Sequence, residues 1–199
     1  KNMKTYLESP QNKPIKEENR FNSWVDRMDN NSTFLSERLC FRGINETDTD
    51  CLVIWRSDPQ TIRYFRRPVP ITKEDHERWY QTAYLQGFGR FDYIIIEKQS
   101  QKAIGTVGVN HVDLRARSCE ISYMIVEPAF QRKGYAVEAI STMMDIAEQE
   151  GICHFFVEIH SENIASRRTI EKLGYTCLNE QQPFVTYYKQ VNVNGSHTS

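Results

Sequence analysis

The chain has 199 residues, a hydrophobic fraction of 39% and a formal net charge of −1 at pH 7. This length suits one main domain with a substantial core. The nearly balanced charge gives no chain-wide attraction for nucleic acid, and no stretch approaches the roughly 18 consecutive apolar residues that a membrane span requires. The composition therefore predicts a globular protein that binds neither polynucleotide nor membrane.

The two ends of the chain differ from its middle. Residues 1–34 are polar and are expected to be an N-terminal extension, partly flexible, with a short helix near Trp24. Because this start lacks the apolar segment of a signal peptide, we expect a cytoplasmic protein. The main domain is expected over residues 35–190 and a flexible tail over 191–199. The segment near Trp24 and the final strands offer places for a homodimer contact.

The five cysteines carry little functional signal. They are widely spaced and form no Cys-x-x-Cys pair, and the chain has no His-x-x-x-His spacing. These patterns match neither a zinc site nor a disulfide framework. We therefore expect reduced thiols and no metal.

The first half of the domain combines one strand with short helices. Apolar and polar residues alternate over 38–42 as in a strand, and 47–55 reads as a helix capped by Thr47 or Asp48. Thr72 begins a capping-box variant that opens the next helix, over 76–86.

The sequence predicts the burial or exposure of three side chains in these helices. Trp55 and Trp79 are expected in the core, in keeping with the burial habits of tryptophan. His76, with charged neighbours on the first turn of its helix, is expected on the surface.

The second half is richer in strands, which short polar turns join as antiparallel neighbours. The expected elements are strands over 91–97, 103–109 and 119–126, a helix from 136 that ends before Gly151, a strand over 152–159, a helix over 163–173, and strands over 175–178 and 184–189. The strand–helix–strand unit makes the strands at 121 and 153 parallel neighbours.

The most informative segment is the turn Gln131-Arg-Lys-Gly134-Tyr-Ala136, which leads from an apolar strand into an amphipathic helix. The first amides of a helix have no partners within it, and the helix dipole adds partial positive charge there. Gly134 and Ala136 remove side chains that would keep an anion away from the backbone, while Arg132 and Lys133 add charge. The turn predicts a pyrophosphate site, and it matches neither a Walker loop nor a three-glycine dinucleotide fingerprint.

With this turn, a second motif, Asn163-Ile-Ala-Ser166-Arg-Arg-Thr-Ile-Glu-Lys-Leu-Gly-Tyr175, completes a pattern that resembles the GNAT superfamily of acetyl-CoA-dependent N-acetyltransferases. The resemblance covers about residues 37 to 190. It implies an α/β GNAT fold: a mixed, mostly antiparallel sheet of six or seven strands with helices on both faces, splayed between the strands at 121 and 153. The pattern is most similar to the ribosomal-protein-alanine or peptide N-terminal acetyltransferases and to the acetyltransferases of nucleotide-linked amino sugars.

The resemblance also implies acetyl-CoA as co-substrate, without a metal. Its diphosphate would lie on the amides of the Gln131 turn, and its pantetheine arm would follow the strand end near Ile125. Asn163 would contact the arm, or simply cap its helix. The cofactor-binding residues expected are Met124, Ile125, Val126, Gln131, Arg132, Lys133, Gly134, Tyr135, Ala136, Val137, Asn163 and Ser166.

For catalysis, the resemblance implies direct transfer to a primary amine in a ternary complex. Glu158 is the first candidate for the general base and Glu120 the second; the alternative for both is an exposed or paired strand carboxylate. The Ile125 amide is expected to meet the oxyanion. Many members place a Tyr where this chain has Ile170, so Ser166 is expected to hydrogen-bond the sulfur, or else only to pack at its helix N-terminus.

The acceptor is expected to be a peptide N-terminus or a small amine such as an amino sugar. The expected substrate contacts are Arg56, Arg66, His111, Tyr123 and His160. The arginines suit a phosphate or carboxylate on the acceptor. The alternative from another class is a non-catalytic acyl-CoA-binding sensor, motivated by Ile170. A second alternative is transfer of a longer acyl chain, which the bulky Tyr123, Met124 and Phe130 disfavour.

Overall fold

The computed structural model describes residues 33–86 and 89–192. These residues form one eight-stranded sheet with the order β1-β2-β3-β4-β5-β6-β8-β7. The strands are β1 (Thr33–Leu35), β2 (Leu39–Gly43), β3 (Phe91–Glu97), β4 (Lys102–Asp113), β5 (Ser118–Ile125), β6 (His154–His160), β7 (Thr176–Gln181) and β8 (Phe184–Gln190). Only β5 and β6 are parallel neighbours, so the predicted mixed, mostly antiparallel sheet is confirmed.

The strand count corrects the prediction of six or seven. The additional strand, β1, runs antiparallel to β2 and pairs Thr33 with Arg42 and Leu35 with Cys40. A strand of three residues is too short to show the alternation that identifies a strand in sequence, which is why it was not predicted. The helix expected near Trp24 lies outside the described residues.

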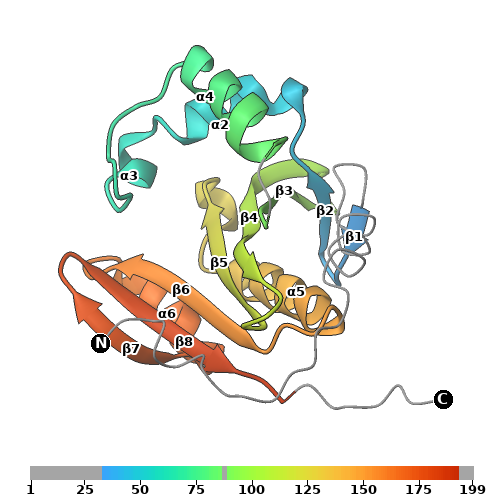
Figure 1. Cartoon of the computed structure of the whole chain (residues 1–199). Coiled ribbons are helices and arrows are strands. Elements are labelled where there is room, and N and C mark those ends of the chain that lie inside the picture. The colour runs from blue at the N-terminus through green and yellow to red at the C-terminus, as the bar shows by residue number, and fades with distance from the viewer. Residues whose placement is uncertain (1–32, 87–88, 193–199) are drawn as a thin grey trace.

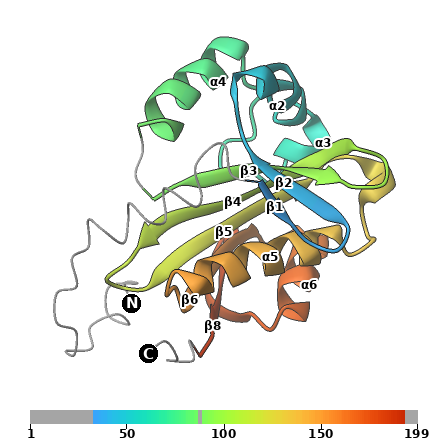
Figure 2. The same cartoon turned by 90° about the vertical axis from the view of Figure 1, so that its right-hand side faces the viewer.

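Helices cover both faces of the sheet, as predicted (Figure 2). On one face lie α2 (Thr49–Trp55) and α4 (Lys73–Trp79), and on the other α5 (Tyr135–Gln149) and α6 (Ile164–Lys172). The shorter helical elements are η2 (Glu46–Asp48), α3 (Pro59–Ile62), η3 (Tyr80–Tyr84) and η4 (Pro128–Phe130). None of the helices in residues 33–86 and 89–192 is both long enough and apolar enough to cross a membrane.

Local side-chain caps explain where the helices of the first half begin. The predicted capping box is present: Thr72 Oγ1 accepts from the Asp75 amide, and the Asp75 carboxylate accepts from the Thr72 amide, both at 3.1 Å. Of the two predicted caps, Asp48 is the N-cap residue of α2, but its side chain makes no capping hydrogen bond there. The element before it, η2, is capped by Asn45, whose side chain accepts from the Thr47 amide at 2.9 Å. Asp58 caps a new short helix, α3.

The sheet separates two apolar cores because alternate side chains of each strand face opposite sides. On β3, Tyr93 and Ile95 belong to the larger core that includes α5 residues such as Ile140. Ile94 belongs to the smaller core beneath α2 and η3, which includes Leu52. Met124 of β5 packs against this smaller core. The side of the sheet that faces α2, α3 and α4 is called the helical-cap side below.

The parallel strands β5 and β6 separate after a short paired stretch. Their pairing runs only from Ser118 with His154 to Glu120 with Phe156. Beyond it, β5 continues to Ile125 and β6 to His160 without pairing to each other. The result is a V-shaped opening in the sheet, with α3 above its open end (Figure 1). The predicted splay between these strands is therefore confirmed.

Candidate active site

The turn between β5 and α5 has the backbone geometry of an anion site. Gly134 is the N-cap of α5 and has a φ of 83°, in the left-handed region that glycine adopts most readily. The first hydrogen bond within the helix runs from the Glu138 amide to the Gly134 carbonyl at 3.0 Å. The amides of Tyr135, Ala136 and Val137 therefore have no partner within the helix. These residues fit the diphosphate of a coenzyme A molecule.

Arg38, which sequence reasoning missed, holds this turn from β2. Its guanidinium donates to Glu138 Oε2 at 2.7 Å and to the Lys133 carbonyl at 2.9 Å. It also lies 4.2 Å from the centre of the Tyr135 ring. No motif marked Arg38, because the contacts join residues about 95 positions apart in the chain. Its role is to fix the carbonyl and helix start that surround the predicted pyrophosphate site.

The Ile125 amide faces the V-shaped opening. Val126 donates its amide to the Ile104 carbonyl of β4 at 2.9 Å. Since successive amides of a strand point in opposite directions, the Ile125 amide points away from β4, toward the side where β6 has separated. From the same side the Gln131 side chain donates to the Ile125 carbonyl at 2.9 Å. Gln131 thus holds the strand end beside the opening.

On the α6 side of the opening, three of the predicted residues are linked by hydrogen bonds. Asn163 caps α6, and its side-chain oxygen accepts from the Ser166 amide at 3.2 Å. The Ser166 hydroxyl is 2.5 Å from the Tyr123 hydroxyl, which reaches it from β5. Burial raises the pKa of Tyr123 to about 12, although the hydrogen bond with Ser166 acts in the opposite direction. The structure therefore presents two linked, protonated hydroxyls at the position where sequence reasoning expected Ser166 alone.

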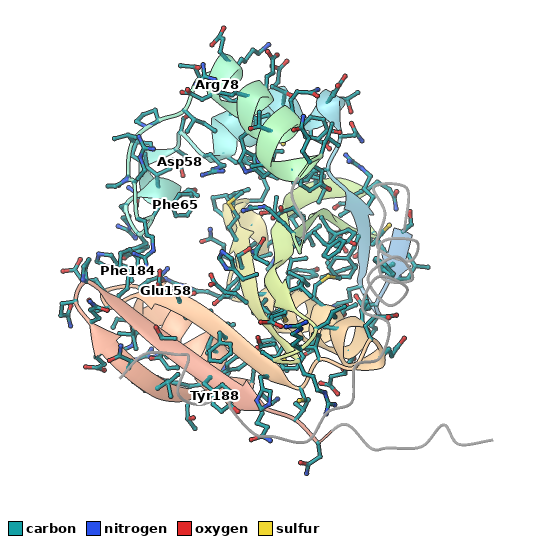
Figure 3. The ribbon with its side chains drawn as sticks, viewed as in Figure 1. Asp58, Phe65, Arg78, Glu158, Phe184 and Tyr188 are labelled. Carbon is teal, nitrogen blue, oxygen red and sulfur yellow. The ribbon has the colours of Figure 1, made fainter. Side chains whose placement is uncertain are left out.

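Glu158 lies beyond the last paired residues of β5 and β6, on the helical-cap side of the sheet. It forms an ion pair with Arg66, from the segment that follows α3. The Arg66 guanidinium also lies 4.8 Å from the centre of the Phe184 ring. Figure 3 shows Glu158 and Phe184 on the β6 and β8 side of the opening, with Phe65 projecting from the α3 segment toward it. Two of the predicted site residues, Glu158 and Arg66, are thus direct partners.

Glu120, the second candidate base, lies at the closed end of the V, because it is in the last residue pair of β5 with β6. Its carboxylate is 3.2 Å from His111 Nδ1 on β4. The His111 side chain is exposed, and its backbone has a φ of 50°. Two predicted residues, Glu120 and His111, are therefore partners here too. This pair lies farther from the unpaired strand ends than Glu158 does.

His160, the last residue of β6, contacts rings rather than acidic groups. Its ring centre is 5.6 Å from that of Tyr64, on the α3 segment, and 5.4 Å from that of Phe184. Its Nδ1 accepts from the Glu162 amide at 3.3 Å. His160 therefore lies where the α3 segment meets β6 and β8, and it helps to hold that segment over the opening.

The helical-cap side contains a buried polar cluster that was only partly predicted. His76 is 2% exposed, so its prediction as a surface residue is wrong. Its helix turns it under α4 beside Trp79, with ring centres 5.3 Å apart, because the opposite face of α4 carries the charged residues. Burial and the nearby Arg56 lower the pKa of His76. The predicted burial of Trp55 is confirmed, with 8% exposed.

Comparison with known proteins agrees with this geometry. A family model described as an acetyltransferase (GNAT) domain matches residues 38–176. The chain belongs to this GNAT acetyltransferase family. It is therefore an acetyl-CoA-dependent N-acetyltransferase, and acetyl-CoA is its co-substrate. In the residues that the structure describes, no group of three or more His, Cys, Asp or Glu side chains is placed to hold a metal ion.

Two sequence relatives and one solved structure extend the comparison. An uncharacterized N-acetyltransferase of Bacillus subtilis, YoaA, is 26% identical over 70% of this chain and 80% of its own. The uncharacterized protein MJ1062 of Methanocaldococcus jannaschii is also 26% identical, over 69% of this chain. The match spans only 28% of the length of that protein. The structure of RimL, a ribosomal L7/L12 α-N-protein acetyltransferase in complex with coenzyme A, matches with a TM-score of 0.67 and 16% identity, over 81% of this chain and 98% of RimL.

Proposed function

We propose that this chain transfers the acetyl group of acetyl-CoA directly to a primary amine, on a peptide N-terminus or a small molecule, within a ternary complex. The observation that supports this most is the V between β5 and β6. One side of it offers the Ile125 amide and the α5 anion site, and the other offers a carboxylate, Glu158. A thioester and an amine can therefore meet in this opening from the two faces of the sheet.

On the acceptor side, Glu158 is the proposed base. An amine with a pKa near ~10 is mostly protonated at neutral pH and must lose a proton before it attacks. Glu158 would take that proton, directly or through a water molecule. In the structure the Glu158 carboxylate is paired with the Arg66 guanidinium, so it already holds a positive charge. The ammonium group of the acceptor would take the place of that guanidinium. Glu120 is the less suitable candidate base, since it lies at the closed end of the V beside His111.

On the thioester side, the Ile125 amide would donate to the developing oxyanion. A fixed backbone donor needs little reorganisation as charge develops, which is why such donors are effective. The departing thiolate would accept a hydrogen bond from Ser166, whose hydroxyl is held by Tyr123. The ammonium nitrogen loses two protons in all: one passes through Glu158 to solvent and the other ends on the sulfur as the C–S bond breaks. No covalent enzyme intermediate is required.

The test is release of free thiol from acetyl-CoA with a panel of peptides, amino sugars and polyamines. We expect turnover with one class of amine. Thermal unfolding with and without acetyl-CoA is measured in parallel. An increase in melting temperature without turnover on any amine would instead support the acyl-CoA-binding sensor, and the absence of both would contradict the cofactor site.

A further inference from the structure

Two guanidinium groups lie near one carboxylate on the helical-cap side, and only one of them binds it. Asp92 of β3 is held by Arg90, with Nε to Oδ2 at 2.5 Å and Nη2 to Oδ1 at 3.3 Å. Arg56, at the end of α2, is half-buried and has no ion pair or hydrogen bond from its side chain among the described residues. Burial and the charge of Arg90 lower the pKa of Arg56, and burial raises the pKa of Asp92. This site therefore has an excess of positive charge.

The surrounding side chains do not supply the missing negative charge. A Cβ on Gly108 would lie 2.5 Å from Asp92 Oδ1, 2.9 Å from Ser122 Oγ and 3.4 Å from Asn110 Nδ2, so these three polar groups converge on one point of the sheet. His76, next to Arg56, has no hydrogen-bond partner for either ring nitrogen among the described residues. Arg56 is a half-buried cation near a carboxylate that another arginine already holds, so an added anion would stabilise it.

Two consecutive residues of the segment after α3 link this excess charge to the proposed base. The Arg56 guanidinium lies 5.8 Å from the centre of the Phe65 ring. The next residue along the chain, Arg66, forms the ion pair with Glu158. An acceptor whose amine reaches Glu158 would therefore extend past Phe65 toward Arg56. Arg63 and Arg67 in the same segment are both exposed and add to the positive field at its entrance.

From this arrangement we infer that the acceptor amine carries an oxyanion, a carboxylate or a phosphate, which Arg56 binds. The inference rests on the proposed function for the position of the amine, and it adds the chemical class of the acceptor. The guanidinium fork is suited to both oxyanions through paired hydrogen bonds. A polyamine would bring further positive charge to a site that already has too much, so polyamines are poor acceptors.

The first experiment compares matched acceptors that differ in one negative charge. Glucosamine 6-phosphate is compared with glucosamine, and the dipeptide amide Ser-Glu with Ser-Gln; spermidine serves as the polycation. We expect the parent to favour one anionic member at least about tenfold in kcat/KM, the scale of a hydrogen bond to a charged group. The pair that shows the preference identifies the source of the anion.

Three variants test whether Arg56 causes the preference. Arg56→Gln should reduce the ratio to about one, and Arg56→Lys, which keeps the charge, should retain part of it. Arg78→Gln, which removes an exposed arginine of α4, should leave it unchanged. A preference for neutral or cationic acceptors in the parent, or a ratio that Arg56→Gln does not change, would overturn the inference.

A binding measurement tests the anion site without turnover. Thermal unfolding is followed with increasing inorganic phosphate at constant ionic strength, with saturating coenzyme A to fill the α5 anion site. Phosphate should raise the melting temperature of the parent and of Arg78→Gln, but not that of Arg56→Gln. Equal shifts in all three would overturn the inference. Absence of turnover with every amine, together with the expected phosphate shifts, would instead contradict the proposed function alone.

Discussion

The two faces of the V-shaped opening are built by different means. On the α5 face the groups proposed to meet the diphosphate and the oxyanion are backbone amides, those of residues 135–137 and of Ile125, and only the thiolate is assigned a side chain, that of Ser166. On the helical-cap side they are side chains: Glu158 with Arg66, Glu120 with His111, and Arg56 near Arg90. If the proposed roles hold, cofactor binding depends mainly on the backbone of the fold, whereas acceptor choice depends on individual side chains.

This difference has a consequence for substitution. A side-chain change on the helical-cap side leaves the amides of β5 and α5 in place, so it should alter reaction with the amine and preserve affinity for acetyl-CoA. A change that moves the backbone near Gly134 should have the opposite effect. Single substitutions on either face can break this separation, and the largest effect is expected at the proposed base.

Removing the proposed base should give the largest loss. Glu158→Gln is expected to lower kcat/KM for the acceptor about 100-fold or more, the usual range for loss of a general base. Its dissociation constant for acetyl-CoA should stay unchanged. Steady-state kinetics and titration with acetyl-CoA check both. Glu77→Gln, at an exposed carboxylate of α4, is the control. If Glu120→Gln has the larger effect, the base has been assigned to the wrong strand.

A methyl group at Gly134 should weaken cofactor binding. Its Cβ would lie 3.4 Å from Arg38 Nη2, and the φ of 83° disfavours alanine by about 1–2 kcal/mol. We expect about tenfold weaker acetyl-CoA binding, from displaced amide donors. Gly174→Ala is a matched control, since its φ is 80° but its Cβ would approach nothing nearer than 4.0 Å. Denaturant unfolding and titration should show that both variants lose stability and that only Gly134→Ala loses affinity.

The Tyr123 hydroxyl should have a moderate effect on the thioester side. Tyr123→Phe is expected to lower kcat about fivefold, the scale of one hydrogen bond, with little change in KM for acetyl-CoA. Because burial raises the pKa of Tyr123 to about 12, its hydroxyl is protonated at both pH 7 and pH 9, and the loss should be equal at the two pH values. Tyr188→Phe removes a hydroxyl that contacts His154 and is the control. A loss that disappears at pH 9 would exclude this role.

The smallest expected effect concerns stability. Burial alone would raise the pKa of Glu138, but hydrogen bonds from Ser36 and Arg38, together with the charge of Arg38, lower it. A carboxyl with a lowered pKa stabilises the fold above its unfolded pKa of ~4.3, and this contribution is lost as the pH falls through the folded value. Glu138→Gln should therefore cost about 1 kcal/mol at pH 7 and less below about pH 4. Urea unfolding at several pH values checks this; a difference that grows in acid would contradict it.

Much of the α5 face, where acetyl-CoA is proposed to bind, was predictable from sequence, because its sequence signals are local. The Gln131 turn, Gly134 as the start of α5 and the splay beside Ile125 lie within one continuous segment and its strand neighbour. Asn163 was expected either to contact the cofactor or to cap a helix, and its cap is observed. Arg38 was missed, because its contacts with Glu138 join positions 100 residues apart.

The helical-cap side was less predictable, since its side-chain contacts depend on how α2, α3 and α4 fold back over the sheet. Glu158, Arg66, Glu120 and His111 were each singled out, but nothing in their spacing revealed that they form two pairs. His76 was misplaced because charged neighbours in sequence occupy the other face of its helix. Asp92 gave one signal that was not used: a buried acidic residue within the apolar run Phe91–Glu97 requires a partner of opposite charge, which is Arg90.

Direct transfer is tested by an initial-rate matrix in which acetyl-CoA and the best amine of the panel are varied together, with free thiol as the product measured. Direct transfer across the V requires both substrates to be bound at once, so double-reciprocal plots should give intersecting lines. Parallel lines, with an acetylated protein detected by mass spectrometry when acetyl-CoA alone is present, would contradict it.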